Sequence, residues 1–334
     1  MEYVDVLIIG AGPAGLAAAN SLQDGGLTVT VLDKGPIADG VVRYPYYMKF
    51  FSTATNLELC GFPLIVRDEK PTREEYLVYL RRFVTERRIH VLTQHRVTSI
   101  DRDPASRQPG FVIRGVNDAA EPFALHSRYV VLATGAYDQP QMLDVPGENL
   151  AKVSHYFTEV HPYAMKKVAV VGGRASAAET ALLLCRNQAE VTLIHRRPKL
   201  EGLKYWIQPD IDNRIASGEI RAYFNARITE IQPKHILVQT ESGEIVQIEN
   251  DYVLAMTGYK PDTTMLEKAG IHYDPDTFRP AADPNTLETN IPGLYVAGVI
   301  VSGNISGEIF IENSRHHGEL ILHAIREKDR ALPA

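Results

Sequence analysis

The feature that most constrains this chain is a glycine-rich turn close to its N-terminus. Residues 6–9 are apolar and lead into Gly10, Gly12 and Gly15, and an alanine-rich segment follows at 16–22. A buried strand, a G-x-G-x-x-G turn and a helix in this order are typical of the first unit of a dinucleotide-binding fold. We therefore predict an α/β fold in which the backbone of this turn and the helix N-terminus bind a pyrophosphate.

The acidic residue that such a fold uses is also present. A second apolar strand is expected over residues 28–32, and it ends at Asp33. A carboxylate roughly 20 residues beyond the glycines lies where it can accept the ribose hydroxyls of an adenosine. Strand, glycines, helix, strand and acid together predict a bound dinucleotide much more strongly than the glycine motif alone.

The same pattern returns in the middle of the chain, so the sequence predicts two dinucleotide-binding units. An apolar run at residues 167–171 precedes Gly172 and Gly173. Arg174 and Ala177 stand where the second and third glycines of the motif belong. Alanine is tolerated at the third position, and Arg174 offers a guanidinium that can pair with phosphate.

The residues after the next predicted strand, 190–194, indicate which dinucleotide the second unit prefers. That strand ends at His195, and Arg196 and Arg197 follow. A carboxylate at this place would repel a 2′-phosphate, whereas an arginine pair binds it through charge-assisted hydrogen bonds. We therefore expect this unit to select NADPH over NADH, with a solvated basic turn as the simpler alternative.

Composition narrows the classes of function and location. With 35 basic and 41 acidic residues the net charge is −6, which argues against a general affinity for nucleic acid or for an anionic membrane. Two cysteines, Cys60 and Cys185, are too few for a secreted disulfide framework. We find no targeting signal and no run of about 20 apolar residues, so we expect a cytoplasmic protein. No metal is expected, because His316 and His317 lack further ligands at metal spacing.

Hydrophobic patterning predicts most of the remaining elements. A helix is expected from an N-cap at Thr72 to about residue 87, and a long C-terminal helix from about Glu308 to residue 327. The C-terminal helix would place Glu308, Glu312 and His316 on one face, which suits a proton donor near a bound cofactor, a surface network or a contact between subunits. Short strands are predicted at 90–92, 96–100, 111–114 and 129–132, and three antiparallel strands at 220–224, 228–232 and 236–239.

An irregular aromatic stretch at residues 43–53 separates the first glycine unit from the helix at Thr72. It has neither helical nor strand periodicity. Aromatic side chains in a loop suit a flat ring ligand, and they equally suit filling beneath a long loop. Both interpretations stay open on the sequence.

Together these features resemble the two-dinucleotide flavoproteins of the low-molecular-weight thioredoxin reductase-like group. Within that group the chain is similar to the bacillithiol disulfide reductase family. The matching segments are Tyr44-Pro45, Phe50-Phe51-Ser52, Gly172-Gly173 with a basic residue after it, Met256-Thr257-Gly258-Tyr259, Ala297-Gly298-Val299-Ile300 and Glu308-Ile309-Phe310-Ile311-Glu312-Asn313. The resemblance implies two Rossmann-like domains: an FAD-binding domain at 1–152 and 257–334, and an NADPH-binding domain at 153–256 inserted into it.

The resemblance also implies which residues bind the two cofactors. Near FAD or NADPH we expect Gly10, Gly12, Pro13, Ala14, Gly15, Asp33, Lys34, Tyr44, Phe51, Ser52, Val97, Ala133, Thr134, Gly135, Gly172, Gly173, Arg174, Ala175, Ser176, His195, Arg196, Arg197, Gly258, Gly298, Val299 and Ile300. Val299 stands where most of these flavoproteins have an aspartate that binds the ribitol chain. The same resemblance implies a homo-oligomer.

Two departures from these families concern thiol chemistry. Thioredoxin reductases have a Cys-x-x-Cys before the second unit, and residues 153–161 contain no cysteine. Bacillithiol disulfide reductases have a cysteine where this chain has Ala14. Disulfide reduction normally proceeds by thiolate attack and a mixed disulfide. Cys60 is therefore the remaining catalytic candidate, because Cys185 is expected to be a buried helix residue.

The resemblance implies an enzyme, an NADPH-dependent flavoprotein oxidoreductase. Hydride would pass from NADPH to FAD and electrons onward to a small-molecule disulfide, such as bacillithiol disulfide, or to a small redox protein. Three alternatives stay open. A ferredoxin or flavodoxin reductase shares this architecture without redox cysteines, a flavin monooxygenase has a linker to which His155, His161 and Tyr163 are loosely similar, and a redox-sensing flavoprotein would have no turnover.

Overall fold

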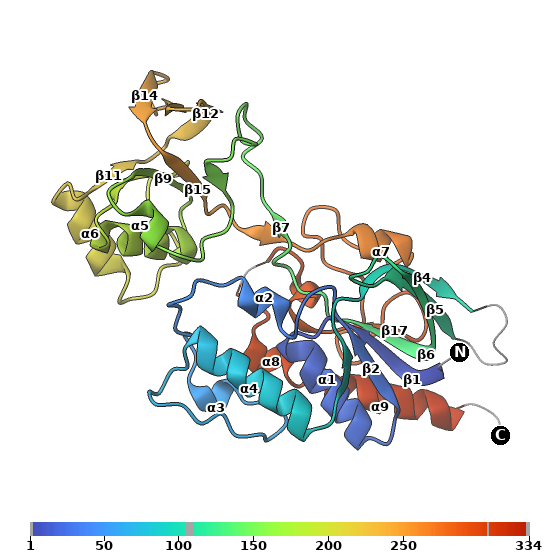
Figure 1. The fold of residues 1–334 in the computed structure, drawn as a ribbon. Helices are drawn as coiled ribbons and strands as arrows, with labels where there is room; N and C mark the ends of the chain where they lie inside the picture. The colour runs from blue at the N-terminus through green and yellow to red at the C-terminus, as the bar shows by residue number, and fades with distance from the viewer. Residues whose placement is uncertain (1–2, 104–109, 306, 332–334) are drawn as a thin grey trace. The chain divides into compact units, whose positions relative to one another are not determined.

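The computed structural model describes residues 3–103, 110–305 and 307–331, and the chain divides into two compact units (Figure 1). Unit 1 contains the chain up to Gln139 and from Lys260 onward, and unit 2 is Pro140–Tyr259. The chain passes between the units at two short strands that pair with each other, β7 (Gln139–Pro140) and β16 (Tyr259–Lys260). Both boundaries proposed from the sequence, 152/153 and 256/257, lie inside unit 2.

Unit 1 is organised around a seven-stranded sheet. Its central strand β1 (Tyr3–Ile9) lies between two parallel neighbours, β2 (Val29–Leu32) and β6 (Pro122–Leu132). Strand β3 (His90–Leu92) continues the parallel order beyond β2. The resulting order β3-β2-β1-β6 is that of a Rossmann half, which confirms the fold class predicted for this part of the chain.

Strand β6 explains why unit 1 is discontinuous in sequence. Its first half pairs antiparallel with β5 (Phe111–Val116), which in turn pairs with β4 (Arg96–Arg102). Its last residues pair in parallel with β17 (Leu294–Val296). A strand from the C-terminal part of the chain thus completes a sheet that the N-terminal part begins.

Alternate residues of β1 face two different cores of unit 1. Val6 and Ile8 pack with residues of three helices, α1 (Pro13–Asp24), α4 (Arg73–Glu86) and α9 (His317–Ala331). Leu7 and Ile9 pack on the opposite face with residues of β4 and β5. Period-2 burial of this kind is what a sheet covered on both faces requires.

Helix α4 begins as the sequence predicts. The Thr72 hydroxyl accepts the backbone N–H of Glu75, and the Glu75 carboxylate accepts the backbone N–H of Thr72 at 2.8 Å. This reciprocal capping box satisfies backbone donors that the first helical turn would otherwise leave unpaired.

Unit 2 repeats the Rossmann order in a smaller form. Five parallel strands lie in the order β11 (Ile220–Tyr223), β10 (Glu190–Ile194), β9 (Lys167–Val171), β15 (Tyr252–Ala255) and β8 (Val153–Ser154). Residues of α5 (Ala175–Arg186) and α6 (Gln208–Ala216) cover one face. An antiparallel sheet of β12 (Arg227–Ile231), β13 (His235–Gln239) and β14 (Ile245–Glu249) covers the other.

One prediction about the strands of unit 2 was wrong, and one strand was missed. Residues 220–224 were expected to begin an antiparallel group, but β11 pairs in parallel with β10, with Ile220 opposite Val191. The third antiparallel strand is instead β14, which the sequence analysis missed. A short apolar run does not by itself show which sheet it joins.

The single C-terminal helix predicted from Glu308 was wrong. The chain forms a 3₁₀ turn η2 (Gly298–Ser302), the four-residue helix α8 (Ile311–Ser314) and then α9 from His317. Glu308 precedes α8 and His316 lies between α8 and α9, so Glu308, Glu312 and His316 do not share one helix face. The side chain of Asn313 bonds to the Phe310 N–H and the Glu308 carbonyl, which fixes an irregular turn where periodicity suggested helix.

The remaining short elements are α2 (Asp39–Val42), α3 (Ala54–Leu57), η1 (His161–Tyr163) and α7 (Thr264–Lys268). Across the part of the chain that the structure describes, no helix is long and apolar enough to cross a membrane.

Candidate functional site

The glycine turn of unit 1 contains two glycines that the protein needs for its own packing and one that it does not. Gly10 has φ +115°, and a Cβ there would lie 2.3 Å from the Ala133 carbonyl oxygen. A Cβ at Gly15 would lie 2.0 Å from the Gly10 oxygen. At Gly12 a Cβ would meet nothing within 4 Å. The open space beside the Gly12 backbone fits a bound group that approaches this backbone closely.

Asp33 is fixed beside this turn. Its Oδ2 accepts the Ala11 N–H at 2.7 Å and its Oδ1 accepts the Gly35 N–H at 2.9 Å. Burial raises the pKa of Asp33, and these two hydrogen bonds act in the opposite direction. A carboxylate has about four acceptor sites, so Asp33 retains capacity for two ribose hydroxyls.

Three strand ends meet at this edge of the sheet. Because β1, β6 and β17 are parallel, the turns after them lie together: Gly10–Gly15, Ala133–Gly135 and Gly298–Ile300. Pro13 and Ala14 begin helix α1 there. Gly135 has φ +74°, and a Cβ on it would lie 4.0 Å from Val299 Cγ2. Val299 is exposed, whereas Ile300 is buried.

Gly298 and Ala14 approach each other closely. Gly298 has φ +81°, and a Cβ on it would lie 2.9 Å from the Cβ of Ala14. The Gly298 N–H donates to Nδ1 of His317 at 3.1 Å. Burial lowers the pKa of His317 to about 4, so the imidazole is neutral and accepts this hydrogen bond. His317 thereby connects η2 to the start of α9, and the sequence held no signal for this role.

The loop residues predicted near the first dinucleotide have distinct surroundings. Lys34 and Arg43 both form ion pairs with Asp138. Although burial acts to raise it, the hydrogen bonds from Lys34 and Arg43 keep the pKa of Asp138 below its usual value. Burial raises the pKa of Tyr44 to about 12, and its ring packs edge-on against Tyr137 with centroids 5.1 Å apart. Arg43, Tyr137 and Asp138 were missed because only the fold brings residues so distant in sequence together.

Three further predicted residues of unit 1 have different surroundings. Phe51 is 39% exposed, and the Ser52 hydroxyl donates to Glu312 Oε1. Val97 is buried in β4, opposite Gly115 and within the core that β4 and β5 form.

The glycine turn of unit 2 is arranged around His195. Gly172 has φ +152°, and a Cβ there would lie 2.4 Å from the Met256 oxygen. A Cβ at Gly173 would lie 2.0 Å from Cε1 of His195, so any other residue there would require the imidazole ring to move. Burial lowers the pKa of His195, and Nε2 is buried with no hydrogen-bond partner in the described part of the chain. Such an orphaned polar atom fits a site that awaits a polar group.

The remaining predicted residues of unit 2 also lie at this sheet edge. Arg174 is the N-cap residue of α5, and Ala175 and Ser176 form its first turn. Gly258, with φ +98°, belongs to unit 2, where its carbonyl accepts the Gln141 N–H at 2.9 Å. The sequence analysis had placed residues from 257 onward in the first dinucleotide domain.

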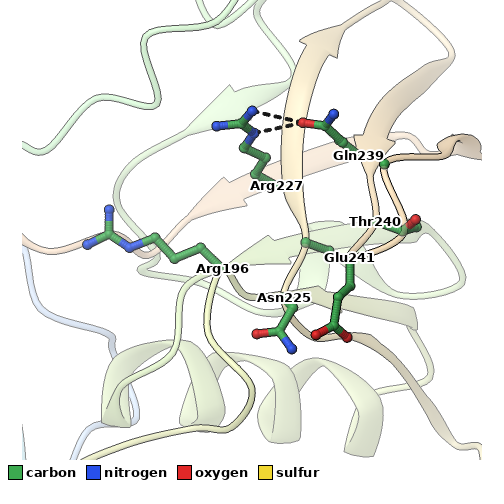
Figure 2. A pocket seen from close by; sticks show the side chains of 8 residues that line it. Arg196, Asn225, Arg227, Gln239, Thr240 and Glu241 are labelled. Atoms are coloured by element: carbon green, nitrogen blue, oxygen red, sulfur yellow. Dashed lines mark hydrogen bonds between the residues drawn. The ribbon is translucent and has the colours of Figure 1, made fainter.

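A cavity of about 380 Å³ lies next to the turn that follows β10 (Figure 2). Arg196 lines it, whereas Arg197 forms an ion pair with Glu201. The other lining residues are Asn225, Ala226, Arg227, Gln239, Thr240, Glu241 and Gly243. The sequence analysis did not identify this second group, because these residues come from β12, β13 and their turns rather than from the glycine motif.

The two cysteines lie in different units and neither is at a strand end. The Cys60 thiol donates to the Ala17 carbonyl at 3.6 Å and lies 3.8 Å from the Ser21 hydroxyl, both on α1. Burial raises the pKa of Cys60, which disfavours the thiolate. Cys185 is half-buried rather than buried, with its sulfur 3.7 Å from Arg214 Nη1. Among the described residues no three His, Cys, Asp or Glu side chains are grouped to hold a metal.

Comparison with known proteins agrees with this arrangement. The family model described as pyridine nucleotide-disulphide oxidoreductase matches residues 7–298, which include both glycine turns. The chain belongs to this family. It is therefore an oxidoreductase, as the sequence resemblance implied.

Individual relatives show the same affiliation. The chain is 38% identical over 324 residues to bacilliredoxin reductase Bdr of Bacillus subtilis, covering 97% of this chain and 98% of that protein. It superposes on the structure of bacillithiol disulfide reductase Bdr (YpdA) from Bacillus cereus with a TM-score of 0.94 at 38% identity, covering 98% and 100% of the two chains. A thioredoxin reductase from T. acidophilum shares the fold, with a TM-score of 0.76 at 23% identity over 99% of this chain and 100% of that one. The predicted relationship to bacillithiol disulfide reductases is confirmed.

Proposed function

We propose that this chain is an FAD-dependent NADPH oxidoreductase whose electron acceptor is a low-molecular-weight disulfide, with bacillithiol disulfide as the first candidate. The observation that supports the two cofactor assignments is the contrast between the two strand ends. In unit 1 a fixed carboxylate, Asp33, follows β2. In unit 2 a neutral imidazole and the Arg196 guanidinium follow β10. A carboxylate suits a ribose diol, and a cation suits a 2′-phosphate.

The residues of unit 1 fit an FAD molecule. The open backbone at Gly12 and the N-terminus of α1 would face the pyrophosphate, and Asp33 would accept the ribose hydroxyls. Bound FAD would supply the hydride and electron chemistry, and no side chain is needed for the hydride transfer itself. The chain contributes binding, orientation and the exclusion of water.

The disulfide assignment comes from the relatives, and it requires a route for two electrons that fits this chain. The balanced reaction consumes NADPH, one proton and a disulfide, and yields NADP⁺ and two thiols as the S–S bond breaks. Ala14 offers no thiol, and the Cys60 thiol is hydrogen-bonded to α1 with a raised pKa. We therefore infer that the two electrons would pass directly from bound, reduced FAD to the disulfide, with no mixed disulfide on a protein cysteine.

Anaerobic stopped-flow absorbance tests this function. NADPH should bleach the flavin of the purified holoprotein, and bacillithiol disulfide should restore its absorbance. We expect Cys60→Ala to keep both rates within about twofold of the parent, because a thiol outside the electron path contributes nothing to the barrier. Cys185→Ala is the matched control in the other unit.

Each other outcome contradicts a different part of the proposal. A flavin that NADPH fails to bleach would exclude NADPH as the donor. A reduced flavin that persists with bacillithiol disulfide would exclude this acceptor, and ferredoxin, flavodoxin or oxygen would be tested next. Loss of reoxidation in Cys60→Ala alone would establish Cys60 as a catalytic residue.

A further inference from the structure

His317 lies between the start of helix α9 and the turn that follows β17. It is the first residue of α9, and it is only 7% exposed. Its Nδ1 accepts the Gly298 N–H at 3.1 Å. Gly298 is the first residue of η2, so this hydrogen bond attaches the beginning of η2 to a distant part of the chain. The imidazole is therefore placed to fix the position of that turn.

Close packing of two helices holds the imidazole in this place. Gly318 follows His317 in α9, and a Cβ on Gly318 would lie 2.5 Å from the Ala18 Cα and 3.0 Å from the Ser21 Cβ. Ala18 and Ser21 belong to α1. Glycine at position 318 thus lets α9 approach the α1 backbone more closely than a side chain would permit. A shift of His317 away from η2 would disturb this packing.

The protonation state of His317 decides whether the hydrogen bond can form. Burial lowers the pKa of His317 to about 4, and the neighbouring His316 acts in the same direction. His317 also lies at the N-terminus of a 15-residue helix, where the helix dipole disfavours a further positive charge. A neutral imidazole carries one proton, and Nδ1 must be without it in order to accept from Gly298. His317 is therefore the neutral tautomer with its proton on Nε2.

The two ends of η2 are held by different side chains. Beyond its last residue, the Asn304 N–H donates to the Thr277 carbonyl at 2.8 Å, and the Asn304 side chain donates to the Asp276 carbonyl at 3.1 Å. At its first residue the restraint is His317. Across the ranges 3–103, 110–305 and 307–331, no other side chain from outside η2 forms a hydrogen bond with the backbone of residues 298–300.

The first residues of η2 lie among the strand ends of unit 1. A Cβ on Gly298 would lie 2.9 Å from the Ala14 Cβ, and a Cβ on Gly135 would lie 4.0 Å from Val299 Cγ2. Val299 has no polar side chain, so it can offer a polar ligand only its backbone groups. The position of the η2 backbone therefore matters for a cofactor that binds at this edge of the sheet.

We propose that His317 is a positioning residue for FAD, which acts by accepting the Gly298 N–H and so holding the first residues of η2 where the cofactor binds. This inference rests on the proposed use of FAD by unit 1. Without the acceptor, the buried N–H of Gly298 would lack a partner, and η2 would shift to find one. Flavin affinity then depends on a side chain outside the glycine motif that acts through another residue.

Two variants of similar shape separate the acceptor from the space that the ring fills. In His317→Asn the amide oxygen can take the place of Nδ1, whereas His317→Leu has a branched side chain without an acceptor. We titrate the full-length apoproteins with FAD and follow flavin fluorescence. The leucine variant should bind FAD about 10- to 100-fold more weakly than the parent, and the asparagine variant should stay within about threefold. His323→Leu, the same change at an exposed histidine of α9, is the control and should bind FAD as the parent does.

Two further measurements do not depend on FAD. Hydrogen exchange of the apoproteins, measured by mass spectrometry, should be faster in the segment that contains Gly298 in His317→Leu than in the parent or in His317→Asn. Nitrogen NMR of the histidine-labelled parent at about pH 7 should show a proton on Nε2 of His317 and none on Nδ1. If His317→Leu does not fold, His317→Phe replaces it, because it keeps a ring and lacks the acceptor.

Three results would overturn the proposal while leaving the proposed function intact. Equal losses of FAD affinity in the leucine and asparagine variants would show that the ring acts only by filling space. Parent-like FAD affinity in His317→Leu would show that the hydrogen bond does not position the cofactor. A proton on Nδ1 would exclude the hydrogen bond itself. If the parent protein does not bind FAD, the proposed function is wrong and this inference falls with it.

Discussion

At the scale of single residues, the glycine turns separate what the fold requires from what a ligand would require. Gly10 and Gly15 are needed because a Cβ at either would collide with backbone atoms of the protein. A Cβ at Gly173 would instead meet the His195 ring, which would have to move. Gly12 alone among these four faces open space. Packing therefore does not explain its place in the motif, and under the proposed function this open space would face the pyrophosphate of FAD.

This contrast gives a prediction about two alanine variants. Gly15→Ala should lower the free energy of unfolding by about 3 kcal/mol or more, because the added Cβ overlaps a backbone oxygen. Gly12→Ala should change it by less than about 0.5 kcal/mol, as at an unconstrained surface site. The same variant should raise the dissociation constant for FAD at least about tenfold, which is about 1.4 kcal/mol.

Urea unfolding of the apoprotein and flavin titration of each variant measure these two quantities separately. A Gly12→Ala variant that loses stability but binds FAD normally would contradict the assignment of the turn to the cofactor.

At the scale of secondary-structure elements, the sequence predicted an element correctly where its side chains form hydrogen bonds with residues close by in the chain. The capping box at Thr72 and Glu75 starts α4 where the sequence predicted it. The prediction of one long C-terminal helix failed because the side chains of Asn313 and Arg315 form hydrogen bonds with backbone groups that are not part of such a helix. The Arg315 guanidinium donates to the carbonyls of Thr55 and Glu58, which are distant in sequence. Periodicity cannot report contacts of this kind.

The cap of α4 provides a quantitative test. Thr72→Ala should lower the free energy of unfolding by about 1 kcal/mol, because it removes the hydroxyl that accepts the Glu75 N–H. Thr53→Ala is the control, since Thr53 precedes the short helix α3 without a side-chain cap bond. That change should cost less than about 0.5 kcal/mol. Chemical denaturation monitored by circular dichroism compares the two, and equal losses would show that the cap bond contributes nothing.

At the scale of the whole molecule, the sequence determined the repeated architecture but not every connection. Two glycine turns, Asp33 and the His195–Arg197 run predicted two Rossmann units, because each motif is a short contiguous run of residues. The insertion of one unit into the other was implied by the family resemblance. The sequence could not show that Arg196 and Arg227 line one cavity, or that Asp138 pairs with Lys34. Those contacts depend on how separate strands come together, and no local pattern encodes them.

The pH dependence of the free energy of unfolding should reflect the burial of His317. Its pKa is lowered to about 4 in the folded protein from an ordinary value of 6.5, so the unfolded chain binds more protons between these pH values. Its contribution to stability is fully present above pH 6.5 and is lost as the pH falls toward 4. Between pH 7 and pH 5 the parent should lose about 2 kcal/mol more than His317→Gln.

Denaturant unfolding at both pH values, at one saturating FAD concentration, measures this difference. His323→Gln is the control, because His323 is exposed on the same helix and its side chain is 75% accessible. It should follow the parent at both pH values. Identical pH dependence in the parent and in His317→Gln would contradict a neutral buried imidazole.

The pairing of β7 with β16 has a consequence for how such a protein changes over evolutionary time. The two ends of unit 2 lie in paired strands and are therefore held together. Because the cost of closing a loop rises only slowly with its length, the length of the segment between these ends has little effect on that cost. A different dinucleotide module could be exchanged at this junction as one genetic segment. Under the proposed function, recombination at two points could thus change the electron donor while unit 1 is inherited unchanged.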